Sequence, residues 1–166
     1  MSRGVAFASV IGGLVGGLLG AGVMSAGHAF VTSLTGKDAP PPASGPKEED
    51  STVKVATRVS EIVRGRPLGE AEKPLAGHLV HYGFGGAMGL LYGVASVATP
   101  IVTLGTGTAF GAAVWLGAHA IVVPALGLAR SPLRQPLGKE ALELVLHLAY
   151  GLTVGLVHRA AVRTAR

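Results

Sequence analysis

The sequence predicts an all-α membrane protein, a single domain in which four antiparallel transmembrane helices form a bundle. Three observations lead to this fold class. Of the 166 residues, 49% are hydrophobic and only 14% are charged, whereas soluble domains carry about 25% charged residues. Two long stretches contain no Asp, Glu, Lys or Arg. Glycines also recur every four residues within the apolar stretches, a spacing typical of packed membrane helices.

The charge-free stretches define the predicted helices. They cover residues 4–36 and 74–129. Because about 20 apolar residues cross a bilayer core, the second stretch holds two spans, with Thr99-Pro100 as the break between them. A further apolar stretch begins just after Glu140. We therefore expect one membrane domain over residues 1–166, with helices at about 5–34, 75–97, 103–126 and 141–158.

The ends and connections of these helices predict a topology. The first helix is about twice as long as the apolar core of a signal peptide, which favours a retained span. An even number of spans places both termini on one side. Lys and Arg are more numerous in the loops 37–73 and 129–140 than near the termini. The positive-inside rule therefore predicts cytoplasmic loops.

The long connection, residues 37–73, is predicted to contain a short amphipathic helix. Asp50 or Ser51 caps its start, and Gly65 and Pro67 end it. Its apolar residues share one face at helical spacing; they are Val55, Ala56, Val59, Ile62 and Val63. Such a helix either packs on its neighbours or lies in the membrane interface.

Glycines four residues apart lie on one face of a helix and allow a neighbouring backbone to approach closely in lipid. Each of the four predicted helices carries such a row. We expect these rows to pack the helices together, and in an alternative interpretation they also serve homo-oligomer formation. The ten predicted packing positions are Gly12, Gly16, Gly20, Gly85, Gly89, Gly93, Gly107, Gly111, Gly151 and Gly155.

A histidine shares the face of each glycine row, and antiparallel order brings the four histidines to the loop side of the bundle at similar depth. These residues are His28, His81, His119 and His147. His78 and Glu143 each lie one turn nearer the loop side. By the same reasoning His158 falls at the opposite end and is excluded. Ionisable groups within a membrane indicate a functional site.

Three interpretations of this cluster remain open. Imidazole and carboxylate groups bind divalent transition metals such as zinc, and histidine also exchanges protons near neutral pH. Alternatively, the histidines hydrogen-bond to neighbouring helix backbones and have no ligand. The predicted ligands are His81, His119, His147 and Glu143, with His28 and His78 as further candidates.

Three segments carry a family resemblance. The pattern His81…Tyr92, then His119-x4-Pro124-x2-Gly127-Leu128, then Glu143-x3-His147-Leu148-x-Tyr150, resembles the YagU-like family of small bacterial inner-membrane proteins. The resemblance covers about residues 75–160 and implies a multi-pass protein of the bacterial inner membrane. The family has no established biochemical activity. Its matching positions are His81, His119, Glu143 and His147, whereas His28 and His78 lie outside the match.

The sequence contains no signature of an enzyme. It has no phosphate-binding glycine loop after a strand, no Gly-x-Ser-x-Gly and no His-Glu-x-x-His, so we predict no enzymatic activity. Its basic residues are spread over loops, which does not favour nucleic-acid binding, and the absence of cysteine excludes disulfides.

Two functions remain. One is a metal-binding or ion-handling membrane protein that uses the His/Glu cluster. The other is a structural or accessory membrane protein whose glycines serve packing and oligomerisation. A membrane-embedded hydrolase, with a metal and Glu143 as base, is a more distant third.

Overall fold

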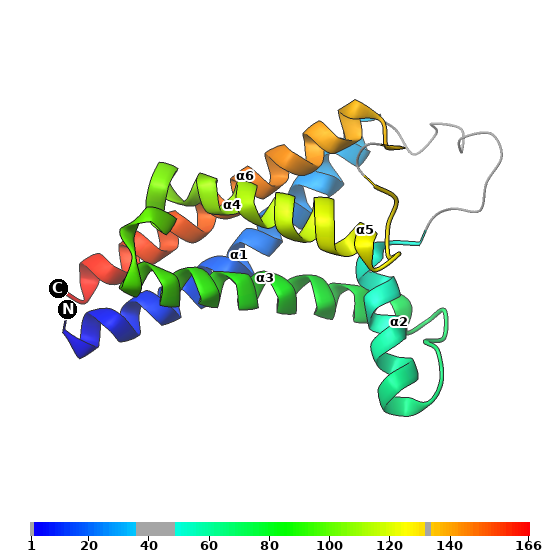
Figure 1. The fold of residues 1–166 in the computed structure, drawn as a ribbon, viewed down its shortest axis with the longest axis horizontal. Helices are drawn as coiled ribbons and strands as arrows, with labels where there is room; N and C mark the ends of the chain where they lie inside the picture. Colours follow the sequence, from blue (N-terminus) through cyan, green and yellow to red (C-terminus); the bar gives the residue numbers. More distant parts are fainter. Residues whose placement is uncertain (1, 36–48, 132–133) are drawn as a thin grey trace.

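The computed structural model describes residues 2–35, 49–131 and 134–166, and this part of the chain is helical without a β-strand. Both termini lie at one end of an elongated bundle, and α2 lies at the other end, across the long axis (Figure 1). In chain order the elements are α1 (Arg3–Thr35), α2 (Ser51–Arg64), α3 (Lys73–Ala98), the 3-10 segment η1 (Pro100–Gly107), α4 (Thr108–Val114), the π-helical segment η2 (Trp115–Val122), α5 (Val123–Ala125) and α6 (Leu137–Thr164).

α1 is the central helix of the bundle. It packs along both α3 and α6, while α4 packs on α6 and α2 packs on α3. The backbones of α3 and α6 stay mostly apart, and these two helices meet through side chains such as Tyr150, whose hydroxyl donates a hydrogen bond to the carbonyl oxygen of Gly85. The helices therefore follow the spatial order α3, α1, α6, α4, which differs from their order in the chain.

Two rows of glycines on α1 allow it to pack closely on both neighbours. A Cβ atom at Gly16 would lie 3.0 Å from the Cα of Val154 on α6, and one at Gly17 would lie 2.9 Å from the Cα of Gly89 on α3. The row Gly12, Gly16 and Gly20 faces α6. The contact with α3 uses a second row, Gly13 and Gly17, which the sequence reasoning did not single out.

Glycines also form the contacts of α6 with α4 and η1. A Cβ at Gly151 would lie 2.8 Å from the Cα of Gly111, and one at Gly155 would overlap the carbonyl group of Thr106. An added Cβ at any of the ten predicted packing glycines would meet an atom of a neighbouring element. Backbone therefore lies directly against backbone along much of the bundle, a close approach that larger residues would prevent.

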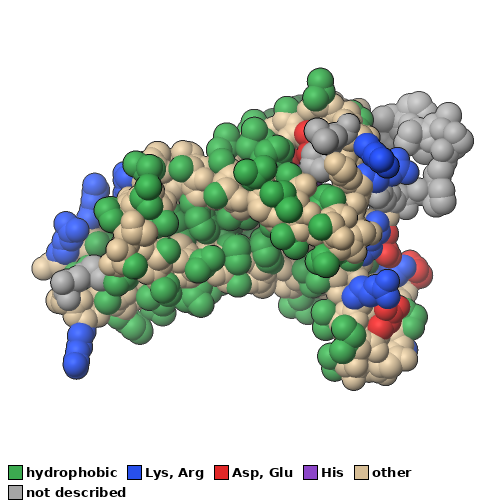
Figure 2. All heavy atoms as spheres, viewed as in Figure 1, with side chains coloured by type: hydrophobic (Ala, Val, Ile, Leu, Met, Phe, Trp, Pro, Cys, Tyr) green, Lys and Arg blue, Asp and Glu red, His purple; other side chains and the backbone are tan. Residues whose placement is uncertain are grey.

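Apolar side chains cover the outside of the bundle as well as its interior. Tyr92 and Val154 are fully buried, and Tyr150 is nearly so. Large apolar residues such as Phe7, Leu19 and Leu156 point outward from the sides of the bundle. Lys and Arg side chains gather at its two ends (Figure 2). This distribution is that of a protein with lipid around its middle.

Within the described residues, three segments are long and apolar enough to cross a membrane: Arg3–Thr35, Pro100–Ala125 and Leu137–Thr164. α3, which contains the second predicted span, is not among them. Its glycines, tyrosines and two histidines lower its mean hydropathy. The structure thus supports an all-α protein with three candidate spans, and the fourth span remains a prediction.

The third predicted helix begins later than expected. We predicted a helix from residue 103, but the backbone leaves the helical region at Leu104 and has positive φ angles of 60° at Gly105, 57° at Thr106 and 91° at Gly107. Glycine tolerates this region readily, so the chain turns here before regular helix resumes at Thr108. The π-helical turns of η2 then precede Pro124, whose missing N–H and bulky ring disturb helical hydrogen bonding.

α2 begins and ends where the sequence predicts. The Asp50 side chain accepts a hydrogen bond of 2.9 Å from the backbone N–H of Thr52, and Gly65 ends the helix with φ of 69°. Ala56 and Ser60 are buried, whereas Ile62 and Val63 are 84% and 76% exposed. One edge of α2 therefore packs on the bundle, and part of its apolar face stays open.

Candidate functional site

His28 on α1 and Glu143 on α6 form a close pair at the loop end of the bundle. The Nε2 atom of His28 lies 2.9 Å from a carboxylate oxygen of Glu143, and its Nδ1 lies 3.1 Å from the carbonyl oxygen of Met24. Both ring nitrogens thus face oxygen atoms. A neutral imidazole has only one N–H, so both contacts are satisfied by an imidazolium beside an ionised Glu143, or by a protonated Glu143 that donates to Nε2. In either form the pair holds one extra proton.

A second pair lies beside the first. The Nε2 atom of His119, on the π-helical segment η2, lies 3.1 Å from a carboxylate oxygen of Glu140 on α6. The His119 ring stacks on Trp115 with a centroid distance of 6.3 Å. Glu140 was not among the predicted site residues, because it stands at the predicted start of a helix, where a charge is ordinarily solvated. π-Helical turns occur frequently at functional sites.

His147 connects the two pairs. Its Nδ1–H donates to the carbonyl oxygen of Glu143 over 2.7 Å, which leaves Nε2 without a proton in the neutral ring. Its ring centroid lies 5.8 Å from that of His119. We call these five residues the titratable row: His28, Glu143, His147, His119 and Glu140. Three of them were predicted ligands, and His28 was a further candidate.

The other two predicted residues have different surroundings. The Nε2 atom of His81 lies 3.1 Å from the carbonyl oxygen of Ala21, at the contact between α3 and α1, and its ring meets Tyr82 edge to face. His81 therefore has the backbone partner that a packing role requires. His78 is exposed near the start of α3.

The structure does not assemble the predicted metal site. Among the residues it describes, no three His, Asp or Glu side chains are grouped in a way that could hold a metal ion. The physical reason is that the side chains pair two by two, His28 with Glu143 and His119 with Glu140, while His81 bonds to backbone. The metal-binding interpretation accordingly receives no support from the structure.

The carboxylates of the row are largely withdrawn from water, and the histidines are more open. The side chains of Glu143 and Glu140 are 15% and 11% exposed, against 43% for His28 and 27% for His119. Partly buried charges interact more strongly than charges in bulk water and need a partner. In the row, each of two largely buried carboxylates therefore contacts a histidine that solvent reaches.

A polar cluster at the opposite end was missed by the sequence reasoning. The Nε2 atom of His158 lies 2.7 Å from Oγ of Ser9 and 2.9 Å from Oγ of Ser96, while Nδ1 is buried without a partner in the described structure. Tyr92 meets the same ring edge to face at 5.2 Å. His158 was excluded because it lies far from the other histidines. The sequence feature that could have indicated this cluster is a serine within each of two otherwise apolar helices, Ser9 in α1 and Ser96 in α3.

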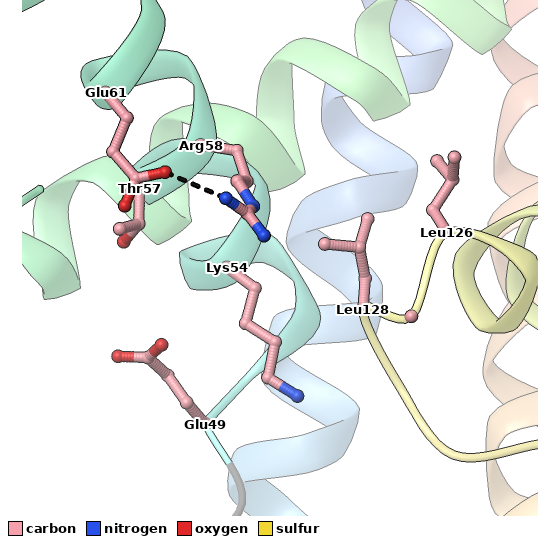
Figure 3. Close-up of a pocket in the computed structure, with 8 residues that line it drawn as sticks. Glu49, Lys54, Thr57, Arg58, Glu61, Leu126 and Leu128 are labelled. Carbon is pink, nitrogen blue, oxygen red and sulfur yellow. Dashed lines mark hydrogen bonds and ion pairs between the residues drawn. The ribbon is translucent and has the colours of Figure 1, made fainter. Parts of the chain in front are cut away.

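A cavity of about 200 Å³ separates α2 from the turn after α5. Figure 3 shows Lys54 and Arg58 on one wall and Leu126 and Leu128 on the other. Arg58 is paired with Glu61 over 3.1 Å. Since this wall carries acids as well as bases, the cavity has no strong preference for one sign of charge.

Taken together, these features define an all-α protein with candidate membrane spans and a titratable row at one end. A family model described as a protein of unknown function (DUF1440) matches residues 68–156, more than half of the chain, and the chain belongs to this family. The matched segment contains the whole row except His28. No curated protein and no solved structure matches the chain. The resemblance to the YagU-like proteins therefore holds at the level of a family of unknown function, and the finer identification stays a prediction.

Proposed function

We propose that this protein crosses a membrane four times, with α1, α3, the α4–η2–α5 segment and α6 as spans. α3 is 26 residues long, about 39 Å, and packs along α1. A bilayer that surrounds α1 would therefore surround α3 as well, despite the lower hydropathy of α3. The resemblance described above favours the inner membrane of a bacterium.

We further propose that the protein handles protons, and that the titratable row takes them up and releases them at the loop-side face. The observation that carries this proposal is the environment of His28, whose two ring nitrogens both face oxygen atoms. A proton is therefore shared between His28 and Glu143. Imidazole changes its protonation near neutral pH, so a histidine is suited to exchange this proton with water.

The remaining members of the row extend the same chemistry. His147 presents an unprotonated Nε2 in its neutral form, and its ring is 5.8 Å from that of His119. His119 in turn contacts the carboxylate of Glu140. Protons can then pass between neighbouring donors and acceptors along the row, with a bridging water where two rings do not touch.

Infrared spectroscopy of the full chain in lipid vesicles tests the proton exchange. Lowering the pH through neutrality should add one proton to the His28–Glu143 pair, seen either as an imidazolium band or as the carbonyl band of a protonated carboxyl group, and Glu143→Gln should remove that change. Glu70→Gln is the matched control, because the Glu70 side chain is 89% exposed and lies outside the row.

Vesicles that enclose a pH-sensitive dye and are placed in acidic buffer test a further step, whether protons exchanged at the loop-side face also cross the membrane. Wild-type protein and Glu70→Gln should acidify the lumen faster than empty vesicles, and Glu143→Gln should return the rate to that background. A wild-type rate equal to that of empty vesicles would rule out proton transport.

A structural or accessory role is the second candidate, favoured by the glycine-to-backbone contacts along α1 and α6. In that role the row contributes only pairing between helices. Glu143→Gln would then lower the stability of the folded protein and leave both spectroscopic and vesicle signals unchanged.

A further inference from the structure

A pocket at the end of the bundle where the termini lie is bordered by three arginines, and apolar atoms of its residues form much of its wall. Its volume is about 240 Å³. One wall is Thr103 on η1, and the other is the last part of α6. The α6 residues that line it are His158, Arg159, Val162 and Arg163, and Arg166 lines it from just beyond the end of the helix.

Arg159 and Arg163 share one face of α6, because they are four residues apart, and Arg166 stands two residues beyond the end of the helix. Every Asp and Glu that the structure describes lies within residues 49–72 or at positions 140 and 143. Those positions belong to the opposite end of the bundle, as the red side chains in Figure 2 indicate. Among the described side chains, therefore, no carboxylate neutralises the three guanidinium groups.

His158 adds a second feature to the pocket. It is only 6% exposed, and Ser9 and Ser96 hold its Nε2 atom. Its Nδ1 atom is buried and lacks a hydrogen-bond partner in the described structure. Buried polar atoms without a partner are rare and cost free energy, so an orphaned nitrogen on a residue that lines a pocket indicates a missing ligand.

We propose that this pocket binds the phosphate group of an anionic phospholipid. Guanidinium groups form paired, charge-assisted hydrogen bonds with phosphate, and basic pockets between membrane helices bind anionic headgroups. Apolar surface for the acyl chains lies close by, since Ile101 and Leu156 are 63% and 53% exposed. A lipid satisfies both the charged pocket and this apolar surface, whereas a soluble phosphate satisfies the pocket alone.

The inference rests on the membrane location proposed above and is independent of proton exchange by the titratable row. Its test uses the full chain purified in a neutral detergent, with thermal unfolding followed as each additive is titrated. The additives are phosphatidylglycerol, phosphatidylcholine and inorganic phosphate. The test variant is Arg159→Gln/Arg163→Gln. The control Arg58→Gln/Arg134→Gln removes the same charge elsewhere.

Phosphatidylglycerol should raise the unfolding temperature of the wild type at concentrations where phosphatidylcholine has no effect. The test variant should bind phosphatidylglycerol about a hundredfold more weakly, or about tenfold for each arginine. The control should bind within roughly twofold of the wild type.

Three results would overturn the inference: equal effects of the two lipids, unchanged binding by the test variant, or saturation of the wild type by inorganic phosphate alone. If the test variant does not fold, native mass spectrometry of the wild type and the control measures which lipid stays bound. Retention of phosphatidylglycerol over phosphatidylcholine would support the inference, and equal retention would overturn it. Failure of the membrane proposal itself is a separate result, seen as a chain that purifies from the soluble fraction without detergent.

Discussion

Glu72 joins the turn between α2 and α3 through contacts that only its ionised form can make. Its carboxylate accepts hydrogen bonds from Arg66 over 2.9 Å and from Arg64 over 3.0 Å, and from the backbone N–H of Gly69 over 2.8 Å. The Arg66 guanidinium, followed by the Gly69 N–H, lowers the pKa of Glu72 from 4.5 to about 2. The group lies outside the candidate spans.

This lowered pKa predicts how the turn responds to acid. A carboxyl whose pKa is depressed by folding stabilises the folded form above its unfolded pKa, and that contribution is lost as pH falls from 4.5 through about 2. The amide resonance of Gly69 should therefore titrate with a midpoint near 2. In Arg66→Gln the midpoint should move up toward 4.5. A wild-type midpoint already at 4.5 would show that the contacts do not persist in solution.

At the residue scale, helical spacing was enough to find part of the titratable row. Glu143 and His147 stand one turn apart, so their shared face follows from the sequence alone. The pairing of Glu143 with His28 rather than with His81 depends on how α1 and α6 rotate about their axes, which spacing on one helix does not fix. His158 was excluded because its position in the sequence places it at the opposite end of the bundle from the other histidines. Only tertiary packing reveals its contacts with Ser9 and Ser96.

At the element scale, the glycine contacts between α1 and α3 govern packing. A Cβ at Gly89 would lie 2.6 Å from the Cα of Gly17 and would overlap the carbonyl oxygen of Gly13. Backbone atoms cannot move aside as a flexible side chain does. A methyl group at this position must therefore push α1 and α3 apart.

Gly89→Ala should thus lower the free energy of unfolding by about 1–3 kcal/mol, the usual cost of overpacking. Gly83→Ala is the matched control on the same helix, since a Cβ there meets nothing within 4 Å. Unfolding in detergent, followed by circular dichroism, measures both variants. Equal stability of the two would mean that the α1–α3 contact is looser than described.

The elements themselves followed from sequence to different degrees. α2 was predictable because a capping acid, an amphipathic pattern and a final glycine all mark its limits. The chain between α3 and α4 was predictable only in part: Thr99-Pro100 marks the end of α3, but the apolar residues that follow resemble a helix. Its turn depends on positive φ angles at Gly105, Thr106 and Gly107, and only the two glycines signal that possibility.

At the scale of the whole molecule, charge and apolar surface are arranged in layers. Basic side chains mark both ends, acidic ones mark the α2 end, and apolar side chains cover the middle (Figure 2). The sequence predicted this layering from two charge-free stretches. It did not predict the spatial order α3, α1, α6, α4, because a row of glycines specifies a close contact without specifying the partner.

The central claim, that the chain crosses the membrane four times, depends most on α3, whose hydropathy alone does not mark it as a span. The chain has no cysteine, so single cysteines can be placed in it and labelled without background. Glu70 precedes α3, Ser131 follows α5, and Thr164 ends α6. Membrane-impermeant labelling of Glu70→Cys, Ser131→Cys and Thr164→Cys in intact cells is the direct measurement. Four spans with cytoplasmic loops predict labelling of Thr164→Cys only, whereas labelling of just one of Glu70→Cys and Ser131→Cys would place them on opposite sides and contradict the account.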